Sequence, residues 1–311
     1  MSVVYVENLV KRYKEVLALD HFNLDIKQGE IFGLLGPNGS GKTTAINCML
    51  QLLTYDKGVI KLFGQDMTPS RYDLKKRIGI VPQNIAVFEE LTVTENVDYF
   101  CALYVSDKAV RTQLVKEAIE FVGLEEYVKF RPRKLSGGLI RRLNIACGIV
   151  HKPELIFLDE PTVAVDPQSR NAILEGIRSL NRNGSTIVYT SHYMEEVEEI
   201  CTRIMIMDHG QILASGTNNE LKAMIGTGEK IQVEVFNLSD EALGAIKALN
   251  CTQRASYDGK TLEVFCTSGA QNLSTVLQTL QQEGLALGRV YSEPPTLNDV
   301  FLELTGTELR D

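Results

Sequence analysis

The sequence predicts an α/β protein in which a largely parallel β-sheet is covered by helices and is followed by a smaller α+β unit. Short apolar strands alternate with stretches of helical periodicity through the larger part of the chain. A glycine-rich loop joins one of these strands to an amphipathic helix, and the pattern restarts near Lys222. We therefore expect two domains, residues 1–222 and 223–311.

The composition excludes several classes of protein. An apolar fraction of 44% and a charged fraction of 23% are ordinary for a globular chain of 311 residues. A net charge of −8 argues against nucleic acid as a partner. No signal peptide is evident, and no apolar run approaches the ~18 residues of a membrane-spanning helix. The six cysteines form no C-x-x-C pair and are expected to be buried thiols in a reducing cytosol: Cys48, Cys101, Cys147, Cys201, Cys251 and Cys266.

The first elements are expected to be β-strands. Phe22, Leu24 and Ile26 alternate with polar residues, and Val3–Val6 is strand-like, so an antiparallel β part should open the chain. Ile31–Leu35 is an apolar run typical of a buried strand. The helix that follows the glycine loop should span Lys42–Leu53.

The rest of the first domain should complete the sheet and add a helical insertion at about residues 84–135. Thr92–Glu95 has the capping-box pattern of a helix start. A second helix of the insertion should cover Val110–Val122, and a helix of the core Ser169–Leu180. Further strands are expected at Val59–Phe63, Ile78–Val81, Leu155–Leu158 and Ile187–Thr190.

The second domain should have the order βαββαβ, which suggests a ferredoxin-like fold. Asp258-Gly259 is the turn signal of its hairpin. The last helix, Leu297–Leu304, carries apolar residues at helical spacing and should stop at Gly306. The other expected elements are strands at Lys230–Phe236, Leu262–Cys266 and Leu287–Tyr291, and helices at Asp240–Leu249 and Ala270–Gln282.

Gly36–Thr43 reads G-P-N-G-S-G-K-T and matches the pattern G-x-x-x-x-G-K-[ST]. Between a strand and a helix, such a loop directs backbone N–H groups and a helix N-terminus at phosphate oxygens. Lys42 would reach the outer phosphates, and the Thr43 hydroxyl would hold Mg²⁺. A glycine-rich surface turn is the plain alternative. The context favours a site for a nucleoside triphosphate.

Two carboxylates follow the strand Leu155–Leu158, at the end of a parallel sheet where ligands collect. Asp159 would orient Mg²⁺ through its water shell, and Glu160 would polarise the attacking water as general base. A solvated acidic turn is the alternative. His192 follows the strand Ile187–Thr190, which should lie beside the first one, so that its imidazole could reach a γ-phosphate. A structural histidine is the alternative.

These motifs together resemble those of the ATP-binding subunits of ABC transporters, over roughly Val3–Leu221. The chain ending Thr296–Gly306 is similar to that of bacterial exporter ATPases related to drug, antibiotic-resistance and sodium efflux systems, which also carry a C-terminal extension. The motifs stand in the family's order: Gly36–Thr43, Gln83, Leu135-Ser136-Gly137-Gly138, Asp159-Glu160, Asp166 and His192. The resemblance implies an ABC-type P-loop NTPase core.

The resemblance also implies a set of site residues for ATP and Mg²⁺. Glu160, His192 and Gln83 would be catalytic, and Thr43, Gln83 and Asp159 would serve the metal. Tyr13 would stack on adenine, although a core or edge-strand tyrosine is the alternative. The residues expected to bind ATP are Tyr13, Gly36, Pro37, Asn38, Gly39, Ser40, Gly41, Lys42, Thr43, Thr44, Ser136, Gly137, Gly138 and Asp166.

The expected partners follow from the same resemblance. Two nucleotide-binding domains pack head to tail, most simply as a homodimer, with ATP between one glycine loop and the other chain's Ser136–Gly138. The helical insertion would dock on integral membrane permease subunits. The protein would thus be cytoplasmic, peripheral on the inner face of the cell membrane. There it would be an ATPase whose dimer closure powers export.

Two departures from the family pattern and two rival classes complete these expectations. Leu139 stands where Gln is usual, and Ala164 where Gly is common; the methyl at Ala164 should keep the backbone at φ below zero. One rival is a soluble ABC protein of translation, repair or cluster assembly. This soluble class is disfavoured by the single ATP-binding domain and the absence of a long coiled-coil pattern. The second rival class, an ATP-binding regulator that does not hydrolyse ATP, is disfavoured by the presence of Glu160 and His192.

Overall fold

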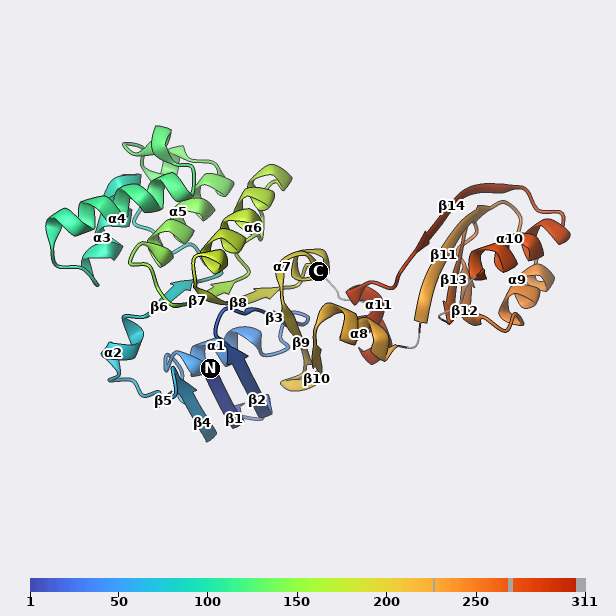
Figure 1. The fold of residues 1–311 in the computed structure, drawn as a ribbon, viewed down its shortest axis with the longest axis horizontal. Coiled ribbons are helices and arrows are strands. Elements are labelled where there is room, and N and C mark those ends of the chain that lie inside the picture. Colours follow the sequence, from blue (N-terminus) through green and yellow to red (C-terminus); the bar gives the residue numbers. More distant parts are fainter. Residues whose placement is uncertain (226, 268–270, 306–311) are drawn as a thin grey trace. The chain divides into compact units, whose positions relative to one another are not determined.

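A computed structural model describes residues 1–225, 227–267 and 271–305. The described residues form two compact units, one over Met1–Ser215 and one from Gly216 to Thr305 (Figure 1). This division falls a few residues before the boundary expected after Lys222. The helix α8 (Asn218–Met224) contacts α11 (Leu297–Thr305), and both belong to the second unit.

The first unit opens with an antiparallel sheet of order β2-β1-β4-β5. This confirms the expected N-terminal β part, but its first two strands are longer than the alternation indicated. β1 pairs antiparallel with both β2 and β4. The strands are β1 (Ser2–Tyr13), β2 (Val16–Lys27), β4 (Lys57–Leu62) and β5 (Gln65–Asp66).

The second sheet of this unit has six strands in the order β10-β9-β3-β8-β7-β6. The pairs β9–β3, β3–β8, β8–β7 and β7–β6 are all parallel, so the carboxyl ends of these five strands lie at one edge. β7 and β8 lie side by side in this sheet, which confirms the expected pairing of these two strands. The strands are β3 (Ile31–Leu35), β6 (Ile78–Val81), β7 (Leu155–Asp159), β8 (Thr186–Ser191), β9 (Arg203–Asp208) and β10 (Gln211–Gly216).

Helices pack on both faces of the six-stranded sheet. α1 lies between the two sheets, in a core with Phe22, Phe32 and Phe157, while α5 and α6 lie on the opposite side (Figure 1). The expected capping box at Thr92 is present and begins α3. The helices are α1 (Lys42–Met49), α2 (Tyr72–Lys75), α3 (Val93–Ala102), α4 (Lys108–Phe121), α5 (Gly137–Ile149), α6 (Pro167–Arg182) and α7 (Met194–Ile200).

The helix α1 ends at Met49, earlier than the expected Leu53. Gln51 adopts a left-handed conformation with φ 57°, and the Leu52 N–H donates to the Asn47 carbonyl at 2.8 Å. This is the Schellman arrangement of a helix end. The apolar spacing continued past Leu50, so the sequence pattern gave no sign of the turn.

The second unit contains an antiparallel sheet of order β12-β13-β11-β14, with the expected hairpin at Asp258-Gly259. Its connections, βαββαβ, are those of a ferredoxin-like unit. Ile231, Val264 and Val276 lie in its core. The elements are β11 (Thr227–Val235), α9 (Asp240–Lys247), β12 (Thr252–Tyr257), β13 (Thr261–Thr267), α10 (Asn272–Gln282) and β14 (Leu287–Glu293).

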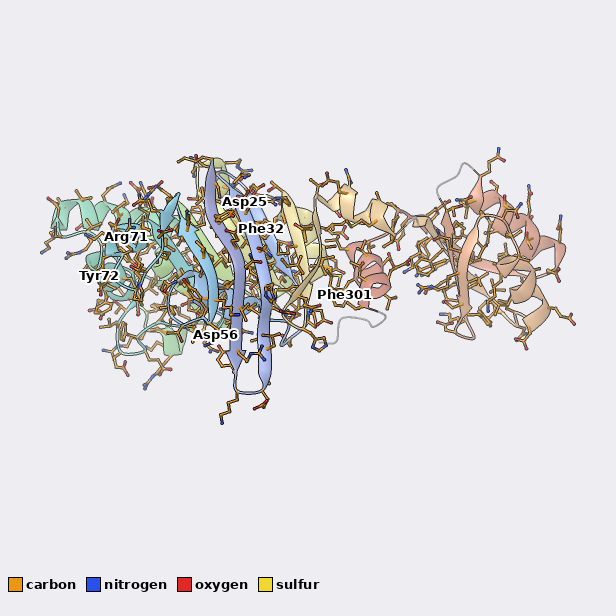
Figure 2. All side chains as sticks on the ribbon, turned by 90° about the horizontal axis from the view of Figure 1, so that it is seen from below. Asp25, Phe32, Asp56, Arg71, Tyr72 and Phe301 are labelled. Atoms are coloured by element: carbon orange, nitrogen blue, oxygen red, sulfur yellow. The ribbon has the colours of Figure 1, made fainter. Side chains whose placement is uncertain are left out.

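The last helix, α11, buries one face. Its buried side chains are Leu297, Val300 and Phe301, of which Phe301 can be located in Figure 2. Gly306, the expected end of this helix, lies outside the described residues. Across the described part of the chain, no helix combines the length and the apolar character that crossing a bilayer requires.

Candidate functional site

The glycine loop follows β3 and packs tightly against its surroundings. A Cβ at Gly36 would lie 2.2 Å from the Met207 carbonyl oxygen of β9, and one at Gly41 would lie 2.7 Å from the Ala18 carbonyl oxygen. Gly39 and Gly41 have φ of 83° and 108°, which glycine adopts readily. The loop is therefore held to this path by glycine, and it leads directly into α1, whose first N–H groups have no partner within the helix.

Lys42 is buried at the start of α1 and is 5% exposed. Its ammonium donates to the carbonyls of Gly36 at 2.7 Å and Pro37 at 3.1 Å. Its Nζ lies 3.8 Å from Glu160 Oε1. Burial lowers the pKa of Lys42, and the Glu160 and Asp159 carboxylates oppose that shift. These two hydrogen bonds leave one of the three ammonium protons for a further acceptor.

Asp159, the last residue of β7, faces the start of α1. Its Oδ2 accepts from the Thr43 hydroxyl at 3.0 Å, and its Oδ1 accepts from the Thr190 hydroxyl of β8 at 2.6 Å. Asp159 is 6% exposed. The Thr43 hydroxyl and an Asp159 oxygen thus lie side by side at the mouth of the glycine loop, where both can face one ligand.

Glu160 directs its side chain to a different set of partners. It adopts φ 47°, an uncommon value for a residue with a side chain, and its N–H donates to Thr190 Oγ1 at 3.0 Å. Gln83 Nε2 donates to its Oε2 at 2.9 Å. His192 Nδ1 lies 3.4 Å from the same oxygen, without the alignment of a hydrogen bond. Asp159 and Glu160 therefore contact different partners, so each carboxylate can serve a different function.

The Thr190 hydroxyl fixes both acids at once, so removing it should destabilise the protein. We expect Thr190→Val to lower the free energy of unfolding by about 1–3 kcal/mol, because Asp159 Oδ1 loses a buried donor. Urea unfolding would measure the change. Thr190→Ser keeps the hydroxyl and should lose less; a valine variant as stable as the serine variant would contradict this role.

A cavity of about 290 Å³ opens beside these groups. It takes its polar lining from the glycine loop, α1 and the two loops that carry Gln83 and Glu160. One apolar wall comes from the start of β2. The lining residues are Val16, Leu17, Ala18, Asn38, Gly39, Gly41, Lys42, Thr43, Thr44, Gln83, Glu160 and His209.

Eight of the expected binding residues lie outside this lining: Tyr13, Gly36, Pro37, Ser40, Ser136, Gly137, Gly138 and Asp166. Tyr13 pairs with Val16 across the β1–β2 hairpin and is 43% exposed, with Lys11 Nζ 4.9 Å from its ring centre. Ser40 is 1% exposed, and its hydroxyl has no hydrogen-bond partner among the described residues. Its N–H donates to the Pro37 carbonyl at 3.1 Å, so Ser40 shapes the loop from inside.

Ser136–Gly138 begins α5, as the sequence suggested, but none of the three residues lines the cavity. The exposed Ser136 caps the helix, accepting from the Leu139 N–H at 3.3 Å. A Cβ at Gly138 would lie 2.7 Å from Ser169 Oγ and 3.1 Å from Asp166 Oδ2, so glycine permits close packing of α5 on α6. The motif is therefore rigidly joined to the start of α6 and separate from this chain's own glycine loop.

Asp166 and Ala164 shape the neighbouring loop. Asp166 caps α6 by accepting from the Ser169 N–H at 2.9 Å, and this bond lowers the pKa of Asp166. The expectation for Ala164 was wrong: it adopts φ 59°, in the left-handed region. The turn before Asp166 requires a positive φ, and Ala adopts it at a local cost of about 1–2 kcal/mol.

The sequence reasoning missed residues that hold the Gln83 loop. Arg141 of α5, 6% exposed, donates to the Gln83 carbonyl at 2.8 Å, and burial lowers its pKa. Asn144 accepts from the Ala86 N–H at 3.0 Å. Arg141 and Asn144 lie one helical turn apart on α5, shortly after Ser136–Gly138, and this spacing was the sequence signal that could have placed them on one face of the helix. His209, on the loop after β9, was also missed.

The groups present fit a divalent cation bound with a triphosphate. Mg²⁺ prefers few protein oxygens and keeps substrate oxygens and water in its shell. The Thr43 hydroxyl and the Asp159 carboxylate supply hard oxygens 3.0 Å apart at the mouth of the glycine loop, and Gln83 is bonded to the neighbouring Glu160.

Comparison with known proteins agrees with this geometry. Residues 19–163 match the family model described as ABC transporter, and residues 216–305 match the model for the C-terminal domain of DrrA1-3-like ATP-binding proteins. The chain is 39% identical to the linearmycin resistance ATP-binding protein LnrL of Bacillus subtilis, covering 99% of this chain and 100% of that protein. It is 33% identical to the Nod factor export ATP-binding protein I of Ralstonia nicotianae, covering 99% and 95% respectively.

A solved structure shows the same fold. A dimeric ATP-binding cassette in a post-hydrolysis state, bound to ADP and Pi, superimposes with a TM-score of 0.64 at 28% identity. It covers 69% of this chain and 98% of its own.

Proposed function

The chain belongs to the ATP-binding subunits of ABC transporters, and we propose that it hydrolyses ATP to power export through separate membrane-spanning subunits. The observation that carries the proposal is the meeting of Lys42, Asp159 and Glu160 at one edge of the parallel sheet. Of the relatives named above, one is named for linearmycin resistance and the other for Nod factor export, and the second name supports export as the direction of transport.

Each group at the edge has a task in hydrolysis. Lys42 meets the outer phosphates, and Glu160 takes a proton from the attacking water. Gln83 donates to Glu160 Oε2, and His192 Nδ1 lies 3.4 Å from the same oxygen. The other oxygen, Oε1, lies 3.8 Å from Lys42 Nζ, so the carboxylate is held next to the group that meets the outer phosphates. Thr43, Asp159 and Gln83 would hold Mg²⁺, which when bound neutralises charge on the phosphate oxygens.

We propose that ATP is enclosed between two chains, in the simplest case two copies of this one. Ser136 and Gly137 are exposed at the start of α5, and the buried Gly138 follows them. A helix N-terminus of this kind suits a γ-phosphate, and all three residues lie outside this chain's own cavity. A second chain can present its helix start to the open mouth. Closure then depends on the γ-phosphate that hydrolysis removes.

The helical insertion carries a surface suited to a membrane subunit. Phe88, Tyr99 and Leu103 form what we call the insertion patch. The Phe88 and Tyr99 rings meet edge to face at 4.8 Å, and Leu103 is one helical turn beyond Tyr99. All three are exposed. Exposed apolar groups gathered in this way mark interaction surfaces. The Gln83 loop lies between the sheet and this patch in the chain, so that movement at the ATP site can reach it.

A charge placed in the insertion patch should uncouple the protein from its permease. We expect Leu103→Glu to reduce copurification of a polytopic membrane protein with the tagged chain at least 10-fold, because the new carboxylate would be buried against apolar groups. The measurement is a pull-down with MgATP from detergent-solubilised membranes. ATP binding by the isolated chain should stay unchanged.

Leu52→Glu is the matched control, because Leu52 is 61% exposed and Leu103 is 59% exposed. Leu52 lies after α1, away from the insertion. Equal recovery of the membrane protein with both variants would contradict the docking surface. Recovery of soluble partners only, by the unaltered chain, would count against the transporter role itself.

A further inference from the structure

Glu196 of α7 is a buried carboxylate outside the site described above. It is 0% exposed, and a buried charge is unfavourable unless it is paired and hydrogen-bonded. One of its oxygens, Oε2, accepts from the Tyr189 hydroxyl at 2.5 Å, from Thr162 Oγ1 at 2.8 Å and from Ser191 Oγ at 3.1 Å. The other, Oε1, lies 2.7 Å from Arg170 Nε, an ion pair without aligned hydrogen-bond geometry.

These four partners come from the segments that carry the reacting groups. Thr162 lies two residues after Glu160. Ser191 ends β8 and directly precedes His192, with Tyr189 two residues earlier on the same strand. Arg170 lies in the first turn of α6, the helix that Asp166 caps. One carboxylate therefore joins the loops of Glu160, His192 and Asp166.

The hydrogen bonds around Glu196 have fixed directions. Burial and the Glu196 carboxylate raise the pKa of Tyr189 well above its ordinary value, so the phenol stays a donor. The Ser191 hydroxyl donates to Glu196 and accepts from the Tyr193 N–H at 2.9 Å, which sets the path of the chain through His192. Three hydroxyls thus donate to Oε2 and Arg170 faces Oε1, so each oxygen of the buried carboxylate has a polar partner.

We propose that Glu196 is a positioning residue for ATP hydrolysis, which fixes Glu160 and His192 in register with each other. The inference rests on the proposed roles of those two residues. Without the carboxylate, the Thr162 and Ser191 hydroxyls lose their common acceptor, and the loops on either side of the 3.4 Å approach of Glu160 to His192 can shift. A shift of about 1 Å can reduce a rate by roughly 100-fold.

The test is Glu196→Gln in the full-length chain, because the amide keeps the shape and removes the charge. We expect kcat for MgATP to fall roughly 10-fold to 100-fold while the Kd for ATP stays unchanged, since Lys42 and the glycine loop do not contact Glu196. Glu195→Gln is the matched control: Glu195 is the preceding residue, its side chain is 89% exposed, and it lies 3.5 Å from Arg170. It should keep the kcat of the unaltered protein.

A double variant separates positioning from a merely structural role. In a Glu160→Gln background, adding Glu196→Gln should cause no further loss of residual turnover, because the group it positions is already gone. A further loss of similar size, or weaker ATP binding, would overturn the inference. If Glu196→Gln does not fold, Thr162→Val removes one hydroxyl from the network and should show the same selective loss of kcat. A normal kcat in Glu196→Gln or in Thr162→Val would also overturn the positioning role of Glu196. Normal turnover of Glu160→Gln alone would instead refute the proposed role of Glu160 as the base.

Discussion

Replacing Glu160 by glutamine is expected to reduce ATP turnover by roughly 10²–10⁴-fold while MgATP still binds. Glutamine keeps the volume that lies against Gln83 and His192 but cannot accept a proton from water at neutral pH. Lys42 keeps its bonds to the Gly36 and Pro37 carbonyls, so the phosphate cradle should persist. Since ATP is no longer consumed, the variant should accumulate as an ATP-bound dimer.

The measurements are phosphate release and size-exclusion chromatography with and without MgATP. Glu154→Gln is a suitable control, because Glu154 directly precedes β7 and pairs with Arg77 far from the cavity. It should turn over normally. Turnover in Glu160→Gln equal to that of this control would refute Glu160 as the base.

The second large effect is expected at Ser136. Ser136→Arg should abolish hydrolysis and ATP-dependent dimer formation, because a long cationic side chain would fill the space where a partner's γ-phosphate must approach. The isolated chain should bind ATP with unchanged affinity, since Ser136 does not line its own cavity. Fluorescent-ATP titration and light scattering would measure the two properties separately.

The matched control is Ser239→Arg in the second unit. Ser239 is also an exposed helix N-cap, and its side chain accepts from the Ala242 N–H at 3.1 Å. Both variants lose a cap, at a cost of about 1 kcal/mol, but only one changes the proposed interface. Weakened ATP binding by monomeric Ser136→Arg would contradict a site shared between two chains.

The sequence predicted much of the fold because its strands are short, apolar and bounded by clear turns. Ile31–Leu35 and Leu155–Leu158 are short apolar runs typical of buried strands, and the glycine loop indicated the order of strand, loop and helix. The left-handed turn at Gln51 could not be predicted, because glutamine carries no preference for it and tertiary contacts determine the helix end. The same is true of Ala164, where loop closure outweighs the residue's own backbone preference.

For the site, motifs indicated which residues meet but not what holds them. Asp159, Glu160 and His192 follow strands, so the parallel sheet alone brings them to one edge. The residues that hold the site do so through contacts between segments distant in sequence, as Thr190, Arg141 and Glu196 show. Sequence periodicity does not indicate such contacts. The side-chain direction of Glu160 likewise depends on its unusual φ, which no pattern around it indicated.

The helix α5 has a consequence for how the two ATP sites of a dimer influence each other. Ser136 at its start would touch the ATP held by the partner, whereas Arg141 farther along holds the Gln83 loop of the chain's own site. In the proposed dimer, a rigid helix that contacts both sites would link them thermodynamically. If ATP at one site changes the affinity of the other by some factor, reciprocity requires the same factor in return. The sign of a single coupling free energy, transmitted along α5, then decides whether ATP fills the two sites of the dimer together or one at a time.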